Sequence, residues 1–512
     1  MANNTQDCPF PSPRLPASGE PLEGFGGHKA ALTLGMVGAG AAALFICAHW
    51  SIALVGAVVV LVLSAVESEP FLLFIIFLTP LGWWLMTEGQ LRDLPGAVRS
   101  LVIVGFFLSR LWRGRVGVRR LLSSSPAWAS LFFLGAIMVS IIFVKGGWSD
   151  YSAHGLYRIG SCLGFFFLIS AWADSPERVR KILLVLLYST IITSVFAILQ
   201  EIVGGFTSFW LYLNPPGDDL VEWKWRATSF LNYPNSLAGY LNLVLPFALA
   251  CYVLGQGKWK KLGGWTVGLG FVALLGTQSV GGLLAFVSIL VLAVFCFARN
   301  RKKRLVLLAG ICASVCLLYV QKQVLNPAHT EEAFGSEALS RLVLWGTAWG
   351  YFMHSPVTGI GWGNFVGLYG SDLSAFSAWI PPGQFAVHNI YLQLLAETGL
   401  VGFAAFFYLV GQSWRQAWGQ LRSSRDFLDL ALAFGVLGAL LSVLVHGFVD
   451  FLFQVSPQFG SLFWGLLGLQ AASARLGSPD SLTISRSFGP EPPIARGGKG
   501  GLPEIASPKG LE

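Results

Sequence analysis

The residues best suited to chemistry lie between Val387 and Gly402, where a polar loop meets an apolar helix. His388 ends the loop, Asn389 is placed to cap the helix, and Glu397 follows, about 12 Å deeper at 1.5 Å per residue. A helix N-terminus disfavours a protonated imidazole and favours a bound anion, so His388 is a candidate general base. A histidine here can also be structural. Glu397 can pair with an arginine or serve the structure.

A second set of polar groups closes the loop 204–235. Its aromatic residues suit a loop at a membrane interface; near its end stand Arg226 and Asn235, and Asn235 is placed to cap the next helix. Arg226 can anchor the loop to lipid headgroups. It can equally hold a phosphate, because a guanidinium presents paired donors to phosphate oxygens and stays charged.

The longest polar segment is the loop 321–389. Apolar and aromatic residues recur at helical spacing from Leu339 to Met353, with Arg341 near the start, which predicts an amphipathic helix on the outer leaflet. Spaced glycines follow from Gly359 to Gly363, and they allow a tight turn and close approach of the backbone to a ligand. This turn lacks the strand and helix of a nucleotide-binding fingerprint.

Asp450 is a further candidate on the same side, just past His446 at the end of an apolar helix. Packing explains His446. Packing also explains Cys312 and Cys316, which are four residues apart on one predicted helix, and no cysteine pair has metal-site spacing.

Composition predicts that these groups belong to a membrane protein. The chain has 512 residues, of which 54% are hydrophobic and 12% charged, far fewer charges than the roughly 25% of a soluble domain. It is therefore expected to be an all-α polytopic membrane bundle of about 12–14 transmembrane helices. The fourteen predicted spans are 30–48, 50–66, 70–86, 97–112, 126–144, 157–173, 182–203, 236–254, 265–279, 281–298, 305–320, 390–411, 427–447 and 458–475.

The positive charges are distributed unequally between the two sets of loops. Of 34 Lys and Arg residues, 19 fall in one set of short loops, eight in the longer opposite loops and seven in the tails. This bias places the short loops and both tails in the cytoplasm and the loops of His388 and Arg226 on the outer side of the membrane. The net charge of +8 is thus an orientation signal that requires no nucleic-acid partner.

Composition also divides the chain. The tails 1–29 and 477–512 are rich in Pro, Gly and Ser and are expected to be disordered. Residues 30–180 predict a transmembrane scaffold, and residues 181–476 a transmembrane domain that carries both polar loops. The N-terminus lacks the pattern of a signal peptide.

The polar motifs, taken in order, resemble those of the bacterial O-antigen ligase and polymerase family. They run from Arg226 to Asn235, then Arg341 with a Trp-rich helix, then Ser355-Pro356 with the glycine turn around Trp362, then His388 to Gln393 with Glu397 and Gly399. The resemblance covers about residues 180–450.

This resemblance implies an inner-membrane glycosyltransferase of the GT-C type that needs no metal and no cofactor. Its donor would be an undecaprenyl-diphosphate-linked glycan, and its acceptor a glycan or lipid. Arg226 would hold the diphosphate and His388 would act at the acceptor hydroxyl, with Arg341 as a second cation. Asn235, Asn389, Glu397 and Trp362 are expected in the substrate site, where aromatic residues such as Trp362, Tyr369 and Trp379 would stack on sugars.

One departure concerns the stretch Ser279-Val280-Gly281-Gly282, where family members often carry Ser-Arg-Gly. Either Arg341 or Arg158 supplies the missing charge, or the donor binds differently. The departure slightly favours a polymerase of exopolysaccharide or O-antigen units over a ligase to lipid A core or a protein O-glycosyltransferase. A flippase is the alternative from another class, but it needs a polar path across the bilayer.

Overall fold

The computed structural model describes residues 50–80, 94–114, 117–144, 149–203, 226–231, 233–297, 305, 308–313, 316, 332–372 and 386–476. The predicted tails, the span 30–48, most of the span 305–320 and most of the loop 204–235 lie outside these residues.

Every regular element in the described part of the chain is a helix. In chain order these are α2 (Trp50–Ala65), α3 (Glu69–Phe77), α4 (Leu94–Trp112), α5 (Val118–Leu121), α6 (Ser125–Ile142), α7 (Asp150–Trp172), α8 (Pro176–Val203), α10 (Pro234–Leu254), α11 (Gly257–Gly276), α12 (Val280–Phe297), α14 (Glu332–His354), α15 (Phe365–Asp372), α16 (Ile390–Ser423), α17 (Phe427–His446), α18 (Leu452–Val455) and α19 (Pro457–Leu476). Twelve of these helices overlap predicted spans, and the all-α polytopic membrane bundle is confirmed.

Fewer helices than the predicted fourteen are individually long and apolar enough to span a membrane. Among the described residues seven qualify, or eight if α2 and α3 form one broken span bent by 118°. The bend falls between α2 and α3, at the positive φ of Glu67. Elsewhere polar positions lower the apolar content, as in α11, which begins with three lysines within its first five residues.

The centre of the bundle is the pair α10 and α17, whose residues are almost all buried. Glycines on α17 make the close approach possible, because a Cβ on Gly435 would lie 2.1 Å from Phe247 and one on Gly438 would lie 2.5 Å from Pro246. The two helices are antiparallel, so the start of α10 lies beside the end of α17. This packing brings Asn235 next to Asp450.

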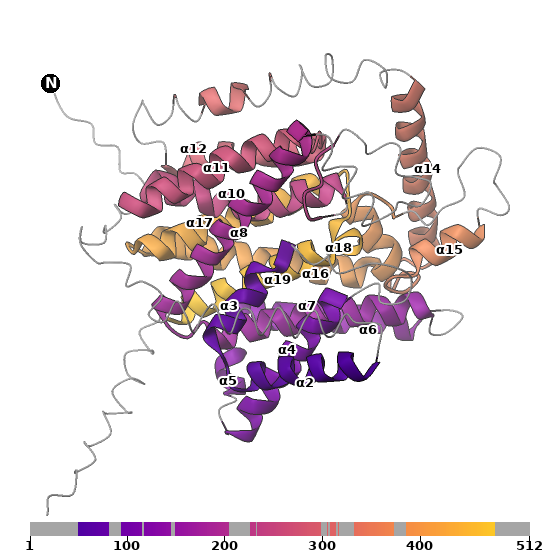
Figure 1. The fold of residues 1–512 in the computed structure, drawn as a ribbon. Helices are drawn as coiled ribbons and strands as arrows, with labels where there is room; N and C mark the ends of the chain where they lie inside the picture. The colour runs from indigo at the N-terminus through magenta and orange to yellow at the C-terminus, as the bar shows by residue number, and fades with distance from the viewer. Residues whose placement is uncertain are drawn as a thin grey trace, which may run out of the picture.

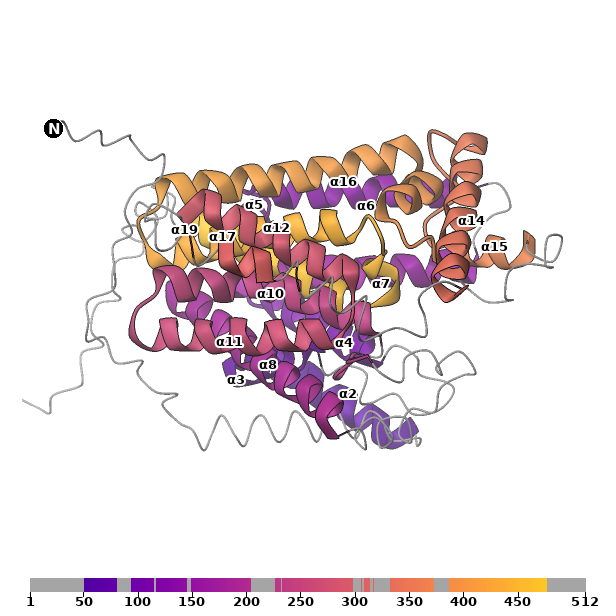
Figure 2. The same ribbon diagram turned by 90° about the horizontal axis from the view of Figure 1, so that it is seen from above.

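The helices of the bundle run roughly along one direction, and α14 crosses them at one end together with α15 (Figure 1, Figure 2). The predicted amphipathic helix Leu339–Met353 is part of α14. Leu344, Ala348 and Phe352 form its buried face, which packs with α16, whereas Leu342, Trp349 and Met353 are exposed.

The other end of the bundle carries the ends of α4, α7 and α19. Arg110 pairs with Glu67 at 3.0 Å, and Lys181 pairs with Glu69 at 2.5 Å. Arg475 donates to the carbonyl of Ser170. Arg110, Lys181 and Arg475, which the charge distribution assigns to the cytoplasmic side, therefore lie at the end opposite α14 and His388.

Candidate active site

His388 is held immediately before the start of α16. The predicted cap is confirmed: the Asn389 side chain accepts hydrogen bonds from the amides of Tyr391 and Leu392, both at 3.0 Å. Its own Nδ2 donates to the carbonyl of Phe448 at 3.0 Å. His388 itself has φ +52°, a left-handed conformation that costs a non-glycine residue about 1 kcal/mol. The cap is one of the contacts that maintain this conformation.

Residue 387 is fixed from two sides. The indole Nε1 of Trp345 on α14 donates to the Val387 carbonyl at 3.1 Å, and the Val387 amide donates to the Gln393 side chain at 3.0 Å. The amphipathic helix thus has a structural task that the sequence pattern did not indicate: it positions the backbone that carries His388.

The imidazole of His388 faces a buried carboxylate. His388 Nδ1 lies 3.1 Å from Asp450 Oδ1, and the Asp450 side chain is fully buried whereas that of His388 is 20% exposed. When Nδ1 carries the proton and donates to Asp450, Nε2 has a free lone pair and can accept a proton. The pair has the arrangement of a general base and the group that orients it.

Asn235 connects this pair to Arg226. Asn235 Nδ2 donates to Asp450 Oδ2 at 2.8 Å, and Arg226 Nη2 donates to Asn235 Oδ1 at 3.1 Å. Arg226 Nε also donates to the carbonyl of Thr277 at 2.8 Å. Four side chains from three separate segments therefore form one hydrogen-bonded chain, Arg226–Asn235–Asp450–His388.

The prediction that Asn235 caps the next helix is wrong. The N-cap of α10 is Tyr233, and Pro234 occupies the first helical position, where its fixed φ and missing N–H are tolerated. Asn235 therefore lies inside the first turn, and its amide is free to bridge Arg226 and Asp450.

The charge of Asp450 is stabilised by its surroundings. Burial alone would raise the pKa of this carboxyl, but the hydrogen bond and charge of His388, the charge of His446 and the hydrogen bond from Asn235 lower it to about 2. The Phe451 amide donates to Oδ1 at 2.7 Å. Asp450 is thus a permanent anion beside His388 at neutral pH.

Glu397 belongs to a different set of contacts. Its side chain is fully buried, and Oε1 accepts the Phe365 amide at 3.1 Å, while its carbonyl accepts the Gly361 amide at 3.0 Å. α16 is broken nearby, at Gly399 with φ +61°, where a Cβ would lie 2.3 Å from the Val357 carbonyl oxygen. Glu397 and the break bind the glycine turn to α16, which gives Glu397 a structural role; its contact with substrate stays a prediction.

Trp362, for which stacking on sugars stays a prediction, is buried in the structure. Its side chain is 6% exposed, and its ring packs edge-on against Phe133 and Phe451 at centroid distances of 6.2 and 6.1 Å. Tyr369 is 2% exposed and stacks on Phe365. Both side chains are part of the core, and Trp379 lies outside the described residues.

The two remaining arginines stand apart from the hydrogen-bonded chain. Arg341 is half-buried on α14, four residues before Trp345, and Arg158 is half-buried on α7. Within the described residues no cluster of three or more His, Cys, Asp or Glu side chains could hold a metal ion.

The turn between α11 and α12 lies beside the site. It is followed by Val280, the position at which the resemblance leads us to expect an arginine. Val280 is 41% exposed and points away from the core, and a Cβ on Gly281 would lie 2.8 Å from the ring of His446. His446 is 2% exposed, in agreement with the packing role expected for it. The carbonyl of Thr277 on this turn instead binds Arg226.

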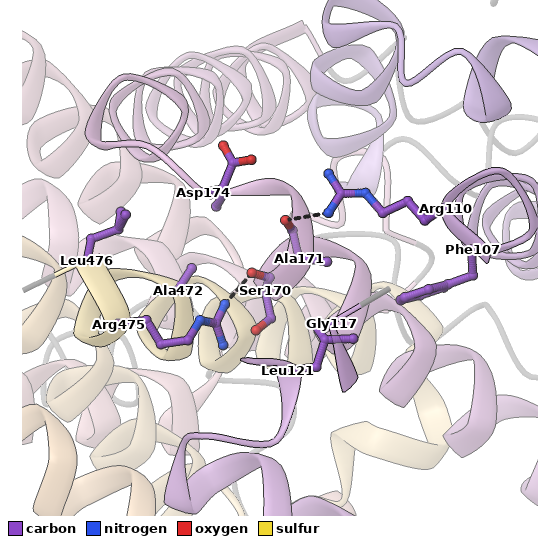
Figure 3. Close-up of a pocket in the computed structure, with 11 residues that line it drawn as sticks. Phe107, Arg110, Gly117, Leu121, Ser170, Ala171, Asp174, Ala472, Arg475 and Leu476 are labelled. Atoms are coloured by element: carbon purple, nitrogen blue, oxygen red, sulfur yellow. Dashed lines mark hydrogen bonds between the residues drawn. The ribbon is translucent and has the colours of Figure 1, made fainter. Parts of the chain in front are cut away.

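A cavity of about 170 Å³ lies at the opposite end of the bundle, between α4, α7 and α19 (Figure 3). Arg110, Asp174 and Arg475 line it. Arg110 is already paired with Glu67, and Asp174 with Arg178 at 2.9 Å. This cavity contains none of the residues of the hydrogen-bonded chain, so its size does not identify the active site.

Residues 265–407 match the model of a protein family described as O-antigen ligase. The resemblance to the O-antigen ligase and polymerase family is confirmed. A curated O-antigen ligase of Salmonella typhimurium is 27% identical over 146 residues, which are 27% of this chain and 35% of that relative. The chain therefore covers about a third of the relative's length.

The O-antigen ligase match contains only part of the hydrogen-bonded chain. His388 and Asn389 lie inside residues 265–407, as do Arg341 and the glycine turn, whereas Arg226, Asn235 and Asp450 lie outside. The structure adds the groups that the family match does not reach. They are joined to His388 by contacts between residues distant in sequence: Asp450 is 62 positions from His388, and Asn235 is 215 positions from Asp450.

Proposed function

We propose that the protein is a membrane glycosyltransferase that transfers glycan from an undecaprenyl-diphosphate carrier at the periplasmic face. The observation that carries this proposal is the chain Arg226–Asn235–Asp450–His388, which joins a cation to a base and its orienting carboxylate. The O-antigen ligase match over residues 265–407 supports glycan transfer in the membrane. The enzyme would need no metal and no cofactor, since the donor carries its own leaving group.

The geometry supports one chemical role for each residue. His388 Nε2 removes the proton of the acceptor hydroxyl, whose oxygen forms a bond to the anomeric carbon of the donor glycan. The bond from that carbon to the diphosphate breaks, and the lipid diphosphate leaves with the electron pair. Asp450 stabilises the imidazolium, and Arg226 stabilises the negative charge that grows on the diphosphate. Attack opposite the leaving group gives inversion at the anomeric carbon.

The orientation of the bundle supports a periplasmic site. His388 and Arg226 lie at the end opposite the clustered cytoplasmic arginines and lysines, such as Arg110 and Lys181. With this orientation both termini are cytoplasmic. The partners are then a lipid-linked donor, an acceptor glycan or lipid, and the membrane lipids themselves.

The acceptor separates the two leading candidates. The absence of an arginine at Val280 slightly favours a polymerase, whose acceptor is another lipid-linked unit. The matched family and the Salmonella typhimurium relative are both named for O-antigen ligase, which supports a ligase. A strain that lacks the gene distinguishes them: single lipid-linked repeat units accumulate if the protein is a polymerase, and long unattached chains accumulate if it is a ligase.

The direct test uses purified protein in detergent, lipid-linked glycan and no nucleotide. We expect the wild-type protein to transfer or lengthen glycan, and we expect His388→Ala and Arg226→Ala each to abolish this while membrane insertion is retained. Arg119→Ala is the matched control, because Arg119 is exposed near the cytoplasmic end. Full activity of His388→Ala would exclude His388 as the base. Lipid movement between leaflets without transfer would indicate a flippase.

A further inference from the structure

Arg99 on α4 is a buried cation that the proposed mechanism does not use. Its side chain is 7% exposed. Nε donates to the hydroxyl of Ser161 on α7 at 2.9 Å, and Nη1 donates to the hydroxyl of Ser461 on α19. Nη2 is buried without a hydrogen-bond partner. Three helices therefore enclose a guanidinium whose hydrogen-bond partners, within the part of the chain that the structure describes, are two neutral hydroxyl groups.

Another arginine on the same helix shows which partners a structural arginine has in this protein. Arg110, also on α4, binds both carboxylate oxygens of Glu67 at 3.1 and 3.0 Å and a backbone carbonyl at 3.3 Å. No carboxylate of the described residues pairs with Arg99 in this way. A buried charge without a counterion is strongly unfavourable, and because the described residues supply none, a bound anion would stabilise Arg99.

The surroundings of Arg99 indicate the chemistry of that anion. The Ser100 hydroxyl lies 3.1 Å from that of Ser161 and 3.3 Å from the Tyr157 hydroxyl. Hydroxyl groups can rotate to donate to an anion, and a guanidinium binds phosphate oxygens in pairs. Together these groups offer a phosphate one cation and up to four hydroxyl groups.

The hydroxyl groups reach the lipid-facing side of the bundle. Tyr157 is 39% exposed, and Ser100 begins a row on α4 that continues with exposed Val104 and Leu108 at intervals of four residues. Residues four apart lie on one face of a helix. A lipid whose phosphate is bound at Arg99 could therefore lay its hydrocarbon chain along Val104 and Leu108.

This cluster lies at the same end of the bundle as His388. The residue before Ser461, Gly460, packs beside Cys162 on α7, and Phe459 packs against Gly239, one turn after Asn235 on α10. We propose that Arg99, Ser161 and Ser461 form a second anion site, separate from Arg226, that binds the phosphate group of a membrane lipid. If the proposed function is correct, a second lipid-linked substrate is one source of that phosphate, and bulk anionic phospholipid is the other.

The test measures lipid binding to the full-length protein in non-ionic detergent by native mass spectrometry. The probes are undecaprenyl diphosphate and phosphatidylglycerol, each titrated alone and in competition. We expect two phosphate lipids per wild-type protein, and loss of one of them, with at least a tenfold weaker affinity, in Arg99→Met. Arg226→Gln should lose the other, and the control Arg119→Gln should keep both. Preferential retention of undecaprenyl diphosphate in competition identifies a lipid-linked substrate, and equal retention identifies bulk phospholipid.

Thermal unfolding is a second, independent test, and it also shows whether Arg99→Met still folds. Removal of an unpaired buried charge should raise the melting temperature of lipid-free Arg99→Met above that of the wild type. Added lipid should then stabilise the wild type more than Arg99→Met. Equal lipid stoichiometry and equal stabilisation by lipid in the two proteins would overturn the proposal. Neither readout depends on glycan transfer, so failure of the proposed function would be detected separately.

Discussion

Replacement of Asp450 by asparagine tests the pairing at the centre of the site. The carboxylate accepts hydrogen bonds from Asn235, His388 and the Phe451 amide, and it is fully buried. Asparagine keeps the volume but removes the charge and turns one acceptor into a donor. That donor must face either Asn235 Nδ2, which is also a donor, or His388 Nδ1. In the second case the imidazole accepts at Nδ1 and carries its proton on Nε2, where it cannot act as a base.

The expected loss of activity follows from these contacts. A hydrogen bond to a charged group contributes about 1.5–3 kcal/mol, which corresponds to a rate decrease of about 10- to 150-fold if it is lost in the transition state. Reversal of the tautomer can extend the loss towards about 10⁴-fold, as in proteases with a comparable His–Asp pair. We therefore expect Asp450→Asn to transfer glycan at least tenfold more slowly than the wild type.

The assay is glycan transfer by purified protein in detergent, with thermal unfolding measured in parallel. Asp429→Asn is the matched control, because Asp429 lies near the other end of α17 and accepts from the hydroxyls of Ser473 and Ser424 at 2.7 and 3.0 Å. It should transfer within about twofold of the wild type, since it contacts no reacting group. A folded Asp450→Asn protein with wild-type activity would refute the assignment of Asp450 as the orienting carboxylate.

The remaining predictions concern the pH dependence and the supports of the site. The folded pKa of Asp450, about 2, lies below the ordinary 3.8. The stabilising contribution of the carboxylate is therefore present above about pH 4 and is lost as the pH falls towards 2, which acid unfolding should show. Asp450 should add no limb to the activity profile between about pH 5 and 9. Trp345→Phe removes one hydrogen bond to Val387, worth about 1 kcal/mol, and should lower transfer several-fold at unchanged membrane insertion. Gly399→Ala places a Cβ 2.3 Å from a backbone oxygen at a positive φ and should lower the melting temperature, whereas Gly411→Ala, with no atom within 4 Å, should not.

Much of the fold was predictable because each membrane helix leaves a strong local signal. A run of apolar residues long enough to cross the bilayer marks each span, and twelve of the described helices overlap predicted spans. The cap at Asn389 was predictable for the same reason, since a capping residue and its helix are adjacent in sequence. The break between α2 and α3 was also predictable, because polar residues separate the predicted spans 50–66 and 70–86, but its angle of 118° was not, because that depends on the conformation of Glu67.

The site was predictable only in part. Side-chain types and the predicted membrane side were enough to select His388, Arg226 and Asp450 as candidates. The contacts between them depend on how α10 and α17 pack, and a local pattern contains no information about residues 215 positions apart. The burial of Trp362 was not predictable for a related reason: an aromatic residue in a polar loop can turn into the core, and only the packing reveals it.

Asn235 is the residue on which the connection between cation and base depends, and its replacement separates a connected site from two neighbouring ones. Asn235→Leu keeps the branching and the number of side-chain heavy atoms but cannot donate to Asp450 or accept from Arg226. If the four residues act together, Asn235→Leu should slow transfer by about tenfold or more, because one charged partner on each side loses a hydrogen bond. Combination with Asp450→Asn should then add little, since residues in one hydrogen-bonded network are not additive. Multiplication of the two separate effects in the double variant would show instead that Arg226 and His388 act independently.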